Sequence, residues 1–161
     1  AFLGLAQMDA AGNINVSKFG PKIAGCGGFI NITQNTHKVV FCGTFTAKGL
    51  REEIRDGKLV ITHEGAVQKF IDKVGQITFS AEYAHKHNQQ VMFITERCVF
   101  VLTDKGLVLT EIAPGVDLQK DILDQMEFVP HIAENLKTMD ERLFRDEPMG
   151  LAQDIFEQQA G

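Results

Sequence analysis

The sequence predicts a single domain of mixed α and β structure, in which strands outnumber helices. Short segments rich in β-branched and aromatic residues recur along the 161 residues, and such segments favour strands. Asp56-Gly57 separates two of them, as in a tight hairpin whose turn residues take positive φ angles. Helical periodicity is confined to a few stretches. Because no repeat, low-complexity tract or linker divides the chain, the fold class is α/β or α+β.

Strand-like segments follow one another through the first 112 residues. They are 2–8, 14–16, 37–44, 53–55, 58–61, 67–74, 76–79, 91–95, 98–103 and 107–112. Asp104-Lys105-Gly106 joins the last two, and Gly106 suits the left-handed position of a three-residue hairpin loop. The sequence therefore predicts two β-hairpins, one at each turn signal.

Helices are predicted at three places. A short helix begins at Phe29, and Ser80 can cap a second one through its hydroxyl oxygen. Asp117 caps the clearest helix, which places four apolar residues on one face: Leu118, Ile122, Leu123 and Met126. Beyond it the periodicity fades, so 135–144 is expected to be irregular and 147–161 a loose tail or weak helix.

Composition excludes several classes of function. A net charge of −5 and a pI near 5.5 argue against a nucleic-acid partner. No apolar run approaches the ~20 residues of a membrane-spanning helix. The three cysteines are far apart with no Cys-x-x-Cys pair, which supports neither a disulfide framework nor a metal site. They are expected to be small apolar residues in a reducing cytoplasm.

The glycine-rich stretch Gly25-Cys26-Gly27-Gly28 is the strongest local signal for a ligand site. Residues 1–50 carry four Lys and one Asp, a net charge of +3, which suits a small anion, although these lysines would equally solubilise loops. Gly25, Gly27 and Gly28 would let backbone amides approach such a ligand closely. Ile30 breaks the dinucleotide fingerprint, and no P-loop lysine follows. A tight, crowded turn is the alternative interpretation.

Glu96-Arg97 interrupts two apolar strands. If both side chains are buried, they must pair with each other or meet a ligand, because an unpaired buried charge costs several kcal/mol. The alternative is a solvent-facing bend between the strands.

Several collinear segments resemble the family I coenzyme A transferases, most closely the single-chain acetate, propionate or acetoacetate type. These segments are 22–33 (KIAGCGGFINIT), 38–44 (KVVFCGT), 76–80 (QITFS), 94–97 (ITER), 111–118 (EIAPGVDL) and 139–144 (MDERLF). The resemblance extends over nearly the whole chain up to about residue 146.

The resemblance implies an open, Rossmann-like α/β mixed sheet with added β-hairpins. It places residues 1–146 in part of the C-terminal half of a duplicated enzyme, with 147–161 as a tail. It implies transfer of coenzyme A between an acyl-CoA and a short-chain carboxylate, by a ping-pong route through a glutamyl-CoA thioester. Coenzyme A is then a co-substrate rather than a permanent cofactor. A homo-oligomer is expected, because apolar surface that meets the missing half would favour self-association. From composition, the location is expected to be cytoplasmic, with neither nucleic acid nor membrane as a partner.

The resemblance also assigns site residues. It places the Gly27 and Gly28 backbone at the oxyanion site, and Gly25, Gly27 and Gly28 in contact with coenzyme A. Glu96 lies in the family's Thr-Glu motif and is implied as a supporting residue. The family's nucleophilic glutamate belongs to a Glu-x-Gly element upstream of Phe2, and Glu64-Gly65 lies in a polar turn that does not match it. The nucleophile is therefore expected to be absent and the chain alone inactive.

Two alternatives remain open at this level. One is a non-catalytic module that binds coenzyme A or forms oligomers. The other is the chemistry of sugar-phosphate isomerases and deaminases, whose superfamily is similar. Because the chain opens without Met, inside an apolar segment, it is expected to be a piece of a longer polypeptide.

Overall fold

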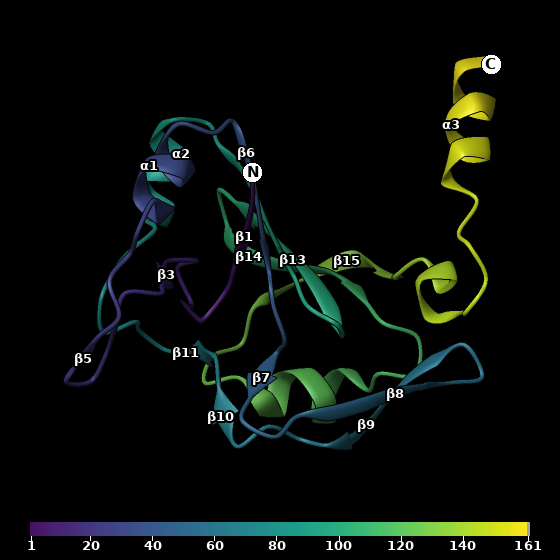
Figure 1. Cartoon of the computed structure of the whole chain (residues 1–161), viewed down its shortest axis with the longest axis horizontal. Helices are drawn as coiled ribbons and strands as arrows, with labels where there is room; N and C mark the ends of the chain where they lie inside the picture. Colours follow the sequence, from purple (N-terminus) through teal and green to yellow (C-terminus); the bar gives the residue numbers. More distant parts are fainter. Residues whose placement is uncertain (161) are drawn as a thin grey trace.

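A six-stranded mixed sheet forms the centre of the molecule (Figure 1). The computed structural model describes residues 1–160, and the side chains of residues 1–157. The sheet runs in the order β1 (Phe2–Gly4), β6 (Lys38–Cys42), β12 (Gln90–Ile94), β13 (Cys98–Thr103), β14 (Gly106–Ile112) and β15 (His131–Thr138). β1, β6 and β12 are parallel, β13 is antiparallel to both β12 and β14, and β15 is parallel to β14. The predicted open, mixed α/β architecture is confirmed.

Two short helices lie in the connections between the parallel strands. α1 (Phe29–Gln34) precedes β6, and α2 (Ala81–Lys86) precedes β12. Figure 1 shows the two helices side by side. The Gln89 amide just after α2 donates to the carbonyls of Thr33 and Thr36, at 2.7 and 2.6 Å. The Ser80 cap is confirmed, because its Oγ accepts from the Tyr83 N–H at 3.2 Å.

Aromatic rings fill the space between the helices and the sheet. The Phe41 ring lies 5.5 Å from that of Phe93 and 5.0 Å from that of Phe79, centroid to centroid. A second stack joins Phe45 and Phe70 at 4.2 Å. Such pairs stabilise a core beyond the area they bury.

Short strands extend the connections. They are β2 (Gln7–Asp9), β3 (Ile14–Asn15), β4 (Lys18–Phe19), β5 (Lys22–Ile23), β7 (Thr46–Ala47), β8 (Arg51–Arg55), β9 (Lys58–His63), β10 (Val67–Gln68) and β11 (Phe70–Ile71). β8 and β9 form the predicted hairpin, whose turn residues Asp56 and Gly57 have φ angles of 52° and 72°. The hairpin of β13 and β14 is confirmed, but Thr103 pairs with Gly106, so its loop consists of Asp104 and Lys105 rather than of three residues. Gly106, the first residue of β14, has a φ of 96°.

The strands predicted at 67–74 and 76–79 are wrong in extent. Only β10 and β11 form in the first segment, and the second contributes one isolated bridge between Ile14 and Phe79. The Thr78 hydroxyl accepts from the Val16 N–H at 3.2 Å. The Thr78 side chain therefore accepts the hydrogen bond that a backbone carbonyl would accept in a continuous sheet.

The helix predicted after Asp117 is a π-helical turn, η1 (Leu118–Ile122), followed by a 3₁₀ turn, η2 (Leu123–Gln125). The Asp117 cap is present, because its Oδ1 accepts from the Lys120 N–H at 2.8 Å. The Arg97 guanidinium donates a hydrogen bond to the Asp121 carbonyl at 2.9 Å. In an α-helix this carbonyl would accept from the N–H four residues later.

The prediction of an irregular segment at 135–144 missed part of β15. This edge strand is mostly exposed and lacks apolar alternation, so backbone pairing with β14 defines it rather than burial. A 3₁₀ turn, η3 (Glu141–Phe144), and a helix, α3 (Leu151–Ala160), follow. α3 stands apart from the sheet in Figure 1, and Arg142 bonds its Asp154 at 2.7 Å. None of the described helices is long and apolar enough to cross a membrane.

Candidate active site

The candidate site lies where the parallel strands end. Gly4, Cys42 and Ile94 are register partners at the carboxyl ends of β1, β6 and β12. Ligands of open α/β sheets bind outside this edge. Of the segments that leave it, 95–97 carries Glu96 and Arg97, and 43–46 contributes backbone groups that bond Glu96 and Lys69.

Arg97 is fully buried at this edge and forms a charged cluster. Its Nε donates to Glu96 Oε1 at 2.7 Å, and its Nη1 donates to Glu64 Oε2 at 2.8 Å. Its guanidinium carbon lies 4.9 Å from the centre of the Phe45 ring. Burial opposes the charge, but hydrogen bonds to the two carboxylates outweigh burial and raise the pKa of Arg97. A buried ion pair is therefore present, and the interpretation as a solvent-facing bend is wrong.

Glu96 is held by both of its carboxylate oxygens. Oε1 accepts from Arg97, and Oε2 accepts from the Phe45 N–H at 2.8 Å. The side chain is 13% exposed. With both oxygens bonded, the Glu96 side chain is fixed between Arg97 and the Phe45 N–H.

Glu64 belongs to the same cluster, although its sequence context predicted only a polar turn. Burial raises the pKa of Glu64, but hydrogen bonds from Arg97 and Thr46 outweigh burial, so the pKa lies below its usual value. A Cβ at Gly65 would lie 2.5 Å from Thr46 Oγ1 and 2.6 Å from the Ala47 carbonyl oxygen, so the next position requires glycine. A buried arginine has five N–H donors, more than the single carboxylate of Glu96 can satisfy. This surplus of donors could have indicated a second carboxylate partner from the sequence.

Lys69 is a second buried cation that sequence reasoning missed. Its Nζ donates to the Thr44 carbonyl at 2.5 Å, rather than to a carboxylate. Burial lowers the pKa of Lys69, and the charge of Glu96 opposes this effect. The ammonium thus lies beside residues 43–46, the segment after β6 whose Phe45 N–H donates to Glu96.

The glycine stretch forms an exposed turn before α1. Gly25 and Gly27 have φ angles of 79° and 52°, which favour glycine. The Gly25 N–H donates to the Ser17 carbonyl at 3.1 Å and is thereby engaged. Within the described residues, the amides of Gly27 and Gly28 donate no hydrogen bond, and none joins this stretch to Glu96. Of the three glycines predicted to present their amides to a ligand, Gly27 and Gly28 therefore remain exposed with unbonded amides.

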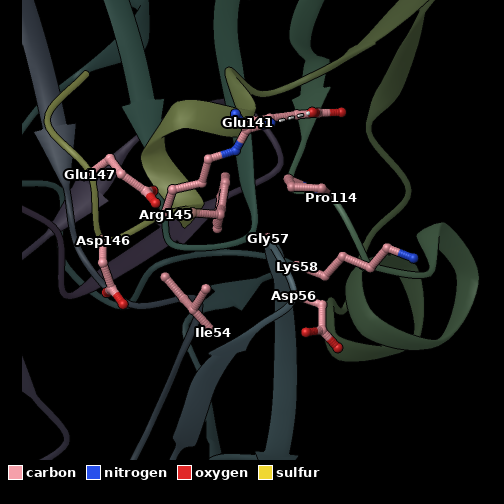
Figure 2. A pocket seen from close by; sticks show the side chains of 10 residues that line it. Ile54, Asp56, Gly57, Lys58, Pro114, Glu141, Arg145, Asp146 and Glu147 are labelled. Atoms are coloured by element: carbon pink, nitrogen blue, oxygen red, sulfur yellow. Dashed lines mark hydrogen bonds and ion pairs between the residues drawn. The ribbon is translucent and has the colours of Figure 1, made fainter. Parts of the chain in front are cut away.

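Two hollows adjoin the β8–β9 hairpin. One, of about 440 Å³, includes Thr95 and Glu96 in its wall. The other, of about 480 Å³, lies between the hairpin tip and the segment after β15. Figure 2 shows its charged residues, which are Asp56 and Lys58 from the hairpin and Glu141, Arg145, Asp146 and Glu147 from the facing segment. Among the described residues, no three His, Cys, Asp or Glu side chains are grouped to hold a metal ion.

Known CoA-transferases are similar to this chain in sequence. The chain is 55% identical to the caffeate CoA-transferase of Acetobacterium woodii, over 94% of this chain and 30% of that protein. It is also 55% identical to the acetate CoA-transferase YdiF of Escherichia coli (strain K12), over 92% of this chain and 28% of that protein. It thus spans about 30% of the length of these relatives.

Solved structures share the fold. The acyl-CoA transferase YdiF of Escherichia coli O157:H7, in a thioester complex with CoA, matches with a TM-score of 0.90 at 55% identity, over 92% of this chain and 29% of that one. Glutaconate coenzyme A-transferase from Acidaminococcus fermentans matches with a TM-score of 0.60 at 15% identity, over 98% and 56% of the two chains, and shows a likeness of fold alone. No family model matches the sequence. By sequence and by fold, the chain is therefore a relative of the CoA-transferases and corresponds to about 30% of their length.

Proposed function

We propose that the chain is the C-terminal portion of a short-chain acyl-CoA:carboxylate CoA-transferase. The observation that carries this proposal is the 55% identity to CoA-transferases over more than nine-tenths of the chain. The names of these relatives refer to acetate and to caffeate, which differ greatly in size. The identity of the acyl group therefore depends on pocket side chains rather than on the general likeness.

The proposed reaction is ping-pong. A glutamate carboxylate attacks the acyl-CoA thioester and forms a mixed anhydride, releasing the coenzyme A thiolate. The thiolate then attacks the glutamyl carbonyl of the anhydride, forming a glutamyl-CoA thioester and releasing the first carboxylate. A second carboxylate reverses both steps and leaves as the new acyl-CoA. Each tetrahedral step builds negative charge on oxygen, which preorganised N–H donors stabilise.

The residues of this chain supply parts of that chemistry. The exposed, unengaged amides of Gly27 and Gly28 are the proposed oxyanion donors. Gly25 is proposed as a coenzyme A contact through its open surface, because its amide is engaged by Ser17. Glu96 is the proposed supporting residue, fixed by Arg97 and by the Phe45 N–H.

The proposed nucleophile lies outside this chain. Glu64 is the glutamate that precedes a glycine, but both of its oxygens are engaged by Arg97. A carboxylate held in this way is a poor nucleophile, because attack would require breaking a buried ion pair. We therefore propose that the 161-residue chain is inactive by itself.

The proposed partners follow from the reaction. They are an acyl-CoA, a short-chain carboxylate and the remainder of the same enzyme, with coenzyme A as co-substrate. A cytoplasmic homo-oligomer is proposed on the same likeness, and the three free cysteines suit a reducing compartment.

A CoA-exchange assay tests the proposal. Acetyl-CoA and labelled propionate are incubated with the native polypeptide from its source organism and, separately, with the 161-residue chain. We expect exchange with the native polypeptide, its loss in a Gly28→Val variant, and none with the chain alone. Turnover by the isolated chain that survives Gly28→Val would overturn the proposal. Binding of coenzyme A by the native polypeptide without exchange would instead favour a non-catalytic module.

A further inference from the structure

One peptide group beyond the end of β6 is held at both ends by charged side chains. The Thr44 carbonyl accepts a hydrogen bond from Lys69 Nζ at 2.5 Å. The Phe45 N–H, which is the other end of the same peptide group, donates to Glu96 Oε2 at 2.8 Å. Hydrogen bonds to ionised groups are stronger than those between neutral groups. An ammonium and a carboxylate therefore fix the orientation of the peptide that joins residues 44 and 45.

The N–H of Thr44 comes directly before this fixed peptide. Thr44 is exposed and follows the last residue of β6 by two positions. The Gly43 N–H donates to the Ile94 carbonyl at 3.1 Å, and the Thr44 hydroxyl donates to the Thr46 carbonyl at 2.7 Å. Within the described part of the chain, the Thr44 N–H donates no hydrogen bond. A backbone donor is thus left over at the edge where open α/β sheets bind their ligands.

The position of Lys69 is unfavourable for stability. Lys69 is 6% exposed, and it takes part in none of the ion pairs between described residues. A Cβ at Gly43 would lie 3.1 Å from Lys69 Nζ, so the ammonium lies close to the segment that carries the free N–H. A buried cation without a carboxylate in contact lowers the free energy of unfolding. Residues that lower stability in this way are often retained for function.

We propose that the Thr44 N–H binds a carboxylate oxygen of the substrate and that Lys69 is a positioning residue for this N–H. Lys69 acts through the peptide that follows Thr44, which it orients together with Glu96, and its positive charge favours an anion nearby. Because Glu96 is paired with Arg97, its charge opposes such an anion less than an unpaired carboxylate would. The identification of the anion as a carboxylate rests on the proposed function, in which a free carboxylate enters and leaves.

The test follows the backbone amide NMR signals of the isotope-labelled 161-residue chain during titration with propionate. Propionamide, a neutral molecule of nearly the same shape, is the matched probe. Lys69→Met removes the ammonium and keeps a long side chain, and Lys73→Met is its control at an exposed position. The free energy of unfolding of both variants is measured in urea, so that affinity and stability are compared in the same proteins.

We expect propionate to shift the Thr44 amide signal more than any other, and propionamide to bind about tenfold more weakly. Lys69→Met should weaken propionate binding about tenfold while leaving the fold at least as stable as wild type, and Lys73→Met should change neither. Three results would overturn the proposal: an unshifted Thr44 signal, equal affinity for the two probes, or wild-type affinity in Lys69→Met.

A loss of affinity in Lys69→Met that is accompanied by a loss of stability would also overturn it, because a lysine that only supports the fold would give that result. Because the amide signals are read without turnover, failure of this test is distinct from failure of the exchange assay.

Discussion

Arg97 donates from Nε to Oε1 of Glu96 at 2.7 Å, with the arginine fully buried at the carboxyl edge of the parallel strands. The same guanidinium binds Glu64, 33 residues away along the chain. Through these bonds one cation fixes two carboxylates and the carbonyl of Asp121. At the carboxyl edge of the parallel strands, where a ligand is expected, the buried arginine is therefore neutralised by carboxylates of the chain itself.

Arg97→Met should destabilise the fold by about 3–5 kcal/mol, because it leaves two carboxylates without their cation. Urea unfolding of the variant and the wild-type chain measures this difference. Arg55→Met is the matched control, since the Arg55–Glu53 pair is exposed and should contribute about 1 kcal/mol or less. Similar losses in the two variants would show that the buried cluster is not a stabilising unit.

Glu64 should make the free energy of unfolding depend on pH in the acidic range. Its pKa in the folded chain lies below the ordinary value of 4.5, so its contribution is fully present above pH 4.5 and is lost as pH falls through the folded pKa. The free-energy difference between wild type and Glu64→Gln should therefore be smaller at pH 3 than at pH 7. Glu134→Gln, at an exposed position, provides the control. A difference that does not change with pH would contradict the assignment.

The buried ammonium of Lys69 should lower the free energy of unfolding at neutral pH. Burial lowers its pKa, so stability rises as pH increases from the folded pKa toward 10.5, the value for the unfolded chain. Lys69→Met removes the buried charge and should raise the free energy of unfolding at pH 7 by about 1 kcal/mol. Lys73→Met, at an exposed position, should have no effect. A destabilised Lys69→Met variant would mean that the ammonium contributes more than its burial costs.

The two adjacent glycines should respond differently to alanine. Gly27 has a φ of 52°, whereas Gly28 has a φ of −84° and space for a Cβ at 3.6 Å from Ile32 Cδ1. Gly27→Ala should cost about 1 kcal/mol through backbone strain, and Gly28→Ala should stay within about 0.5 kcal/mol of wild type. Urea midpoints of the two variants give the comparison. Equal losses would contradict the described turn.

Features set by neighbouring residues could be predicted from the sequence. The Asp56-Gly57 turn, the Ser80 cap and the hairpin at Gly106 each depend on chemistry within a few positions. β15 could not be predicted, because its exposed residues form a strand only through backbone bonds to β14. The hydrogen bond from Arg97 to the Asp121 carbonyl could not be predicted either, because it joins positions 24 residues apart.

In the candidate site, too, local features could be predicted and those that depend on distant residues could not. Glu96 and Arg97 stood out because charges interrupt apolar strands. Glu64 did not, because its partner is distant in sequence, and Lys69 is ordinary until folding buries it. The glycines of residues 25–28 form a turn in open space rather than the crowded turn of the alternative interpretation. The sequence could not show that the Ser17 carbonyl engages the amide of Gly25.

The location of the nucleophile is the central claim, and mapping the covalent glutamyl-CoA adduct tests it most directly. The native polypeptide and the 161-residue chain are each incubated with acetyl-CoA, trapped with borohydride and analysed by intact mass and peptide mapping. We predict a trapped glutamate in the native polypeptide, at a position outside these 161 residues, and an unchanged mass for the chain alone. A trapped glutamate within the 161 residues, or an adduct on the isolated chain, would contradict the claim.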